Sequence, residues 1–74
     1  MDNPFKYKSY SIIDGNKILK YFVNCKTRAS AENIMRDEMF YNGNNEEQIE
    51  GAVSIGLFED NIVCFLIEEV KDAI

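Results

Sequence analysis

The sequence predicts an α+β fold, a small antiparallel sheet of two hairpins with one helix packed on one face, in the order ββαββ. Three observations carry this prediction. Apolar stretches occur in two pairs, turn residues interrupt each pair, and apolar residues at helical spacing lie between the pairs. The 74 residues are expected to form a single domain, 1–74, because the chain is too short for a linker and a second core.

Residues 5–13 and 17–26 are predicted to form the first hairpin. The turn between them contains Asp14, Gly15 and Asn16, and Gly and Asn tolerate the positive φ that tight hairpin turns require. The length of the turn decides which side chains face the core. A two-residue loop places Tyr10, Ile12, Leu19, Tyr21 and Val23 on the core face, and a three-residue loop places Ile18 and Phe22 there instead.

The predicted helix begins at a cap on Thr27 or Ser30 and stops near residues 42–43, where Asn-Gly follows the apolar stripe. Apolar residues at this spacing are typical of a helix that faces a core. Beyond it, Asn45 and Gln48 have the spacing of a capping box, which predicts one further helical turn ending at Gly51. The stripe consists of Ala31, Ile34, Met35 and Met39.

Residues 53–58 and 62–67 are predicted to form the second hairpin, with Asp60 and Asn61 as a two-residue turn. Both faces of this hairpin are apolar, so the face away from the helix also requires a cover. A domain this small gains stability from oligomerisation, and we therefore expect a homodimer through the second sheet face. That face is expected to include some combination of Phe22, Phe58, Phe65 and Ile67.

The composition argues against an enzyme. The chain has no histidine and no glycine-rich phosphate-binding loop. Glu68 and Glu69 are adjacent in a predicted strand, so they point to opposite faces and cannot share a site. Neither Cys25 nor Cys64 has a second ligand at metal-binding spacing. The sequence thus predicts a non-enzymatic protein with no cofactor and no metal.

Both cysteines lie among apolar residues of predicted strands, and we expect them to be buried, reduced and inert, as in a cytoplasmic protein. No stretch approaches the length of a membrane span, so no membrane partner is expected. The abundance of Asn, Ile, Lys and Glu is typical of AT-rich genomes and fits a bacterium or one of its phages.

The net charge of −5 is unevenly distributed. Residues 1–36 contain seven basic and three acidic residues, whereas residues 37–74 contain one basic and ten acidic residues. An acidic array of this kind complements a basic surface, including a nucleic-acid-binding surface, on another protein. We expect a binding protein that modulates or inhibits another macromolecule, such as a phage or mobile-element accessory protein acting on a host protein. The expected contacts are Glu46, Glu47, Glu50, Glu59 and Asp60, with Tyr41 and Phe58 as exposed aromatic anchors.

Two other hypotheses start from the basic N-terminal half. An oligomer could capture a small phosphate-containing ligand, or the first hairpin could bind nucleic acid by stacking bases on its aromatic rings. The acidity of the whole chain argues against nucleic-acid binding. The residues expected in the ligand site are Lys20, Lys26, Arg28, Tyr7 and Tyr21.

Overall fold

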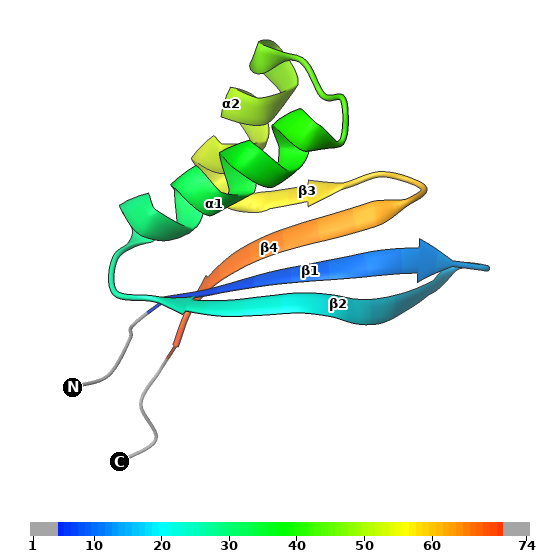
Figure 1. The fold of residues 1–74 in the computed structure, drawn as a ribbon, viewed down its shortest axis with the longest axis horizontal. Helices are drawn as coiled ribbons and strands as arrows, with labels where there is room; N and C mark the ends of the chain where they lie inside the picture. Colours follow the sequence, from blue (N-terminus) through cyan, green and yellow to red (C-terminus); the bar gives the residue numbers. More distant parts are fainter. Residues whose placement is uncertain (1–4, 71–74) are drawn as a thin grey trace.

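Both helices lie on one face of an antiparallel sheet (Figure 1). The computed structural model describes residues 5–70, apart from the side chains of residues 20–23. The predicted α+β class with a small antiparallel sheet is confirmed. The predicted order ββαββ with one helix is wrong, because a second helix replaces part of the second hairpin. The elements are β1 (Phe5–Ile13), β2 (Asn16–Cys25), α1 (Arg28–Tyr41), α2 (Glu46–Ile55), β3 (Leu57–Glu59) and β4 (Val63–Glu69).

The four described strands have the spatial order β2-β1-β4-β3, so the two hairpins share one sheet. Its two central strands are β1 and β4, which pair from Phe5 opposite Glu69 to Ser11 opposite Val63. Each hairpin therefore contributes one central strand and one edge strand.

The first hairpin has the predicted two-residue turn, since Ile13 pairs with Asn16 and both turn residues have positive φ (52° at Asp14, 79° at Gly15). A shift in register follows between Ser9 and Tyr10. Because Tyr10 pairs with Leu19 but Ser9 pairs with Tyr21, Lys20 is an extra residue that forms a bulge in β2.

The predicted core face of this hairpin is wrong for Tyr10, Ile12 and Leu19, whereas the side chains of Tyr21 and Val23 lie outside the described residues. Tyr7 and Ser9 are buried, whereas Tyr10 and Ile12 lie at the alternate positions of β1 and are only partly buried. The reason is visible in the pattern of the strand. Its apolar residues occupy odd positions near Tyr7 and even positions near Tyr10, so alternation alone does not select one face.

Helix α1 follows the prediction. The Thr27 hydroxyl caps its start by accepting a hydrogen bond from the Ser30 backbone N–H at 3.1 Å, and Asn42 caps its end. The apolar stripe faces the sheet, and Ala31, Met35 and Met39 are fully buried. The stripe is therefore core, as its spacing indicated.

Helix α2 is longer than predicted. Asn45 and Gln48 form the expected capping box, but the helix continues through Gly51 to Ile55. It ends at Gly56, whose φ of 75° is the left-handed conformation that terminates many helices. Residues 53–55 are therefore helix rather than strand. A short apolar segment is compatible with the spacing of a helix and with that of a strand. Here the helix is favoured because Ile49, Ala52 and Val53 form one buried helical face.

The turn between β3 and β4 is also longer than predicted. Glu59 pairs with Cys64, and the Asp60 carboxylate accepts hydrogen bonds from the backbone N–H groups of Ile62 (2.7 Å) and Val63 (2.9 Å). This turn replaces the expected two-residue loop because the Asp60 side chain satisfies two turn amides.

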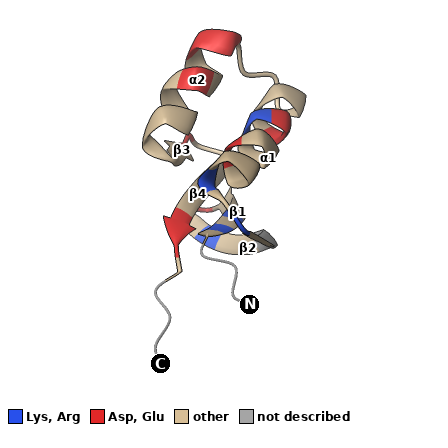
Figure 2. Cartoon of the chain, turned by 90° about the vertical axis from the view of Figure 1, so that its left-hand side faces the viewer, with Lys and Arg blue, Asp and Glu red and all other residues tan. Residues whose placement is uncertain are grey.

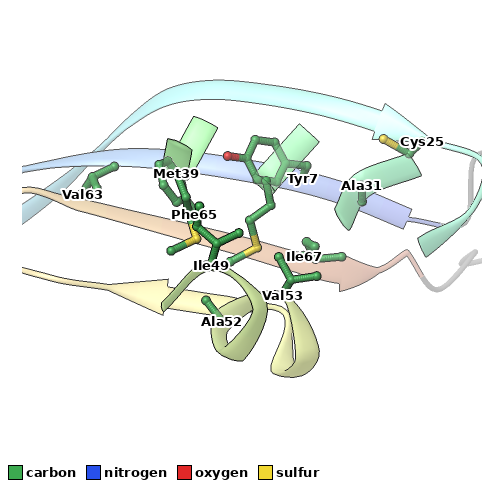
Figure 3. Close-up of a cluster of buried hydrophobic side chains, with 11 residues drawn as sticks. Tyr7, Cys25, Ala31, Met39, Ile49, Ala52, Val53, Val63, Phe65 and Ile67 are labelled. Atoms are coloured by element: carbon green, nitrogen blue, oxygen red, sulfur yellow. The ribbon is translucent and has the colours of Figure 1, made fainter. Parts of the chain in front are cut away.

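The helix-covered face of the sheet holds the core (Figure 3). Phe65 and Ile67 are buried in it, and Phe58 packs against it. The expectation that these three residues lie on the second face is wrong, because β3 and β4 turn their aromatic residues toward the helices. The buried cluster comprises Tyr7, Cys25, Ala31, Met35, Met39, Ile49, Ala52, Val53, Val63, Phe65 and Ile67.

Candidate protein-binding surface

Two adjacent aromatic side chains are exposed at the end of α1. Phe40 is 67% exposed and Tyr41 is 83% exposed, and their rings meet edge to face with 5.7 Å between centroids. Each residue advances about 100° around a helix, so the two positions after the buried Met39 turn away from the sheet. Exposed rings of this size in a small domain are typical of a binding surface.

A shallow depression lies beside Phe40, between the end of α1 and the start of α2. Its volume is about 440 Å³. The lining combines an aromatic ring and an aliphatic side chain with amides and charged groups: Arg36, Asp37, Phe40, Asn44, Asn45, Glu46, Ile49 and Glu50.

The first turn of α2 supplies two exposed carboxylates, Glu46 and Glu47, at this end of the helix pair (Figure 2). Their negative charge interacts favourably with the N-terminal end of the helix dipole. The helix thus tolerates two adjacent carboxylates, and Glu46 lines the depression together with Phe40.

Glu50 has a structural partner. Its two carboxylate oxygens accept hydrogen bonds from Nε (2.9 Å) and Nη2 (3.2 Å) of Arg36. This bidentate contact joins α2 to α1, and the hydrogen bond with Arg36 lowers the pKa of the Glu50 carboxyl. Glu50 therefore fixes the helix pair and is not a free acidic contact.

The other predicted contact residues lie apart from this surface. Glu59 forms an ion pair with Lys17 at 2.5 Å, and the Asp60 carboxylate holds the β3–β4 turn. Phe58 stacks on Phe65 with 6.1 Å between ring centroids and is only partly exposed. It is not the exposed anchor that we expected. Of the predicted set, the structure therefore brings Glu46 and Glu50 to the depression. Tyr41 is linked to it by its ring contact with Phe40, and Glu47 follows Glu46 in the first turn of α2.

Sequence reasoning missed Phe40 and Arg36 as parts of this surface. Phe40 follows Met39, the last residue of the apolar stripe, and this position could have predicted that its ring is exposed. The contact of Arg36 with Glu50 depends on the packing of α1 against α2, so it could not be predicted from the local sequence.

The predicted ligand residues are not gathered into one site. Tyr7 is fully buried in the core, and Lys26 is exposed after the end of β2. The Arg28 guanidinium donates hydrogen bonds to a Glu32 oxygen (2.8 Å) and to the Val53 carbonyl (3.2 Å). Arg28 thus gives the Val53 carbonyl at the end of α2 a second donor, in addition to the Gly56 backbone N–H (3.2 Å). The side chains of Lys20 and Tyr21 lie outside the described residues.

Cys25 and Cys64 are free thiols and both are buried. Burial raises the pKa of each thiol, which lowers the fraction of reactive thiolate near neutral pH. We expect both to react with an aromatic disulfide reagent about tenfold or more slowly in the folded protein than in the urea-unfolded chain at the same pH. The reaction is measured by absorbance. Equal thiol reaction rates in the folded and unfolded states would contradict the buried positions of Cys25 and Cys64.

The described residues hold no group of three His, Cys, Asp or Glu side chains arranged to bind a metal ion. Neither α1 nor α2 is long and apolar enough to cross a membrane, and no other helix occurs in residues 5–70. Comparison of the chain with protein-family models, curated proteins and solved structures gave no match.

Proposed function

We propose that this chain is a non-enzymatic protein-binding module that recognises a basic surface on another protein with the end of its helix pair. The observation that supports the proposal most is the pair of exposed aromatic rings, Phe40 and Tyr41, beside the acidic first turn of α2. We call the surface formed by Phe40, Tyr41, Glu46 and Glu47 the acidic–aromatic surface.

The chemistry of this surface suits a protein partner. Aromatic side chains bury large areas at low entropic cost and dominate interface hot spots. Carboxylates at the rim attract a basic partner and exclude acidic ones. Both helices are capped, and the contact of Arg36 on α1 with Glu50 on α2 joins them. The helix pair is therefore rigid, and little conformational entropy is lost when a partner binds.

Binding itself would be the activity. A small rigid domain that covers a basic surface prevents that surface from reaching nucleic acid or another acidic ligand. This role fits an accessory protein of a phage or mobile element that acts on a host protein in the cytoplasm. The two buried thiols agree with such a reducing compartment.

The test combines partner capture with two variants of the surface. The immobilised chain is exposed to host-cell lysate, retained proteins are identified, and affinities are then measured with the purified partner at two salt concentrations. Glu46→Gln with Glu47→Gln should weaken binding about tenfold and reduce its salt dependence. Tyr41→Ala should weaken binding about tenfold to thirtyfold, since it removes an exposed ring.

A matched control removes the same charge elsewhere. Asp14→Asn with Glu69→Gln changes one turn residue and one strand-end residue, both exposed. Asp14 lies in the β1–β2 turn, and Glu69 lies near the C-terminal end of α2, at the opposite end of that helix from Glu46 and Glu47. Asn also tolerates the positive φ at position 14. This control should bind like the parent protein. An equal loss in both double variants would mean that net charge alone drives binding, and the proposed surface would be wrong.

A further inference from the structure

The sheet face opposite the helices carries an apolar strip that runs diagonally across the four described strands, because Tyr10 lies opposite Cys64 and Leu66 lies opposite Lys8. Tyr10 pairs with Leu19 across β1 and β2, and Leu66 pairs with Leu57 across β4 and β3. Leu19 is 56% exposed and Leu57 is 43% exposed, while Tyr10 and Leu66 are partly buried between them. We call these four residues the leucine strip.

Ion pairs lie on both sides of the leucine strip. Lys8 of β1 pairs with Glu68 of β4 toward the chain ends. Lys17 of β2 pairs with Glu59 of β3 toward the turns, so this second ion pair links the two edge strands across the sheet. On a chain with a net charge of −5, this face has its described carboxylates neutralised by neighbouring lysines. The leucine strip thus lies between two charge-balanced ion pairs, an arrangement that resembles the apolar core and polar rim of a protein interface.

The edges of the sheet are poorly suited to strand addition. The bulge at Lys20 interrupts the regular ladder of β2, and β3 has only three residues. Bulges, lysines and short edge strands are the devices by which sheets avoid edge pairing. The open face is therefore the better place for self-association.

We propose that two copies of this chain pack face to face through the leucine strip. A two-fold axis brings each strip onto its equivalent and places the lysines and carboxylates of one rim beside those of the other, so the contact is complementary to itself. The expected homodimer is retained, but its interface changes, because Phe65 and Ile67 belong to the core of each copy. The arrangement goes beyond the proposed function, since it leaves two acidic–aromatic surfaces on the outside.

The size of the face sets the expected affinity. Seven residues of β4 extend about 23 Å, and four strands span roughly 19 Å. Each copy thus contributes at most on the order of 400 Å², or about 800 Å² for the pair, which is below the range of stable specific interfaces and within that of weak, transient ones. We therefore expect a dimer that dissociates on dilution.

Sedimentation velocity from about 10 µM to about 1 mM tests the proposal. The parent protein should pass reversibly from monomer to dimer across this range. Leu19→Glu, and independently Leu57→Glu on another strand, should remain monomeric, because each buries an unpaired charge at the interface. Both side chains are exposed in the single chain, so the circular dichroism spectrum and melting temperature at low concentration should change little.

Ile18→Glu is the matched control. Ile18 is the neighbour of Leu19 in β2, is 51% exposed and points to the other face of the sheet. This variant should dimerise like the parent protein. A parent protein that stays monomeric throughout, a Leu19→Glu variant that still dimerises, or an equal loss in Ile18→Glu would each overturn the proposal.

Discussion

Replacing Phe65 with alanine is expected to leave the chain largely unfolded at 25 °C. Phe65 is fully buried at the centre of the sheet, where its ring stacks with Tyr7 (6.0 Å between centroids) and Phe58 (6.1 Å). Truncating a buried Phe costs about 3–5 kcal/mol. A single core of this size supplies roughly the same amount in total. The variant should therefore lose its cooperative thermal transition and its dispersed amide NMR spectrum.

Ile18→Ala provides the comparison for Phe65→Ala. It also removes an apolar side chain from a strand, but that side chain is exposed, so the cost should stay within about 1 kcal/mol. If Phe65→Ala unfolded with a midpoint close to that of Ile18→Ala, the core assigned to the helix-covered face would be wrong.

Gly56→Ala is expected to lower the free energy of unfolding by about 2–3 kcal/mol and the melting temperature by roughly 10–20 °C. Gly56 ends α2 with φ of 75°, which a side chain disfavours. An added Cβ would lie 2.9 Å from Nη2 of Arg28 and 3.3 Å from the Ile67 carbonyl oxygen. The Gly56 carbonyl also accepts a hydrogen bond from the Ile67 N–H at 2.8 Å, so the backbone has little freedom to move aside.

Alanine substitutions at two other glycines separate the conformational cost of positive φ from the cost of the close contacts at Gly56. Gly43 also has positive φ but open space around it, so Gly43→Ala should show the conformational cost alone, about 1–2 kcal/mol. Gly51 lies inside α2 with no neighbour near an added Cβ, and Gly51→Ala should stabilise by about 0.5–1 kcal/mol. Urea denaturation measures all three. Equal losses at Gly56 and Gly43 would show that the contacts at Gly56 do not matter.

The features predicted from sequence were those with a local chemical cause. The turn at Asp14 and Gly15 needs residues that accept positive φ, and the start of α1 needs the hydroxyl of Thr27. The capping box of Asn45 and Gln48 is likewise a contact within one turn. In each case the residues that form the structure are neighbours in the chain.

The features missed depend on packing between distant segments. Residues 53–55 are helical because Ala52 and Val53 complete a buried face together with Ile49. The β-branched side chains of Val53 and Ile55 lower the intrinsic helix propensity of this segment. Which side of β1 faces inward was decided by the helices that cover Tyr7. The bulge at Lys20 then shifts the register of the facing strand.

The candidate surface was partly predictable for the same reason. Glu46 and Glu47 follow a cap signal, so their exposure on a first helical turn could be inferred. The partner of Glu50 and the burial of Phe58 could not, because both depend on how α2 and β3 pack against the rest.

The position of β1 and β4 at the centre of the sheet governs how the protein forms. The two hairpins are joined by the pairing of β1 with β4, and both helices lie between these strands in the sequence. Because the strands are far apart in the chain, their pairing costs a large amount of chain entropy. During synthesis, β1, β2 and α1 leave the ribosome before Phe65 exists to fill the core. Folding is thus expected to wait for the last strand, and the amide protons of the β1–β4 ladder should exchange with solvent only when the whole domain opens.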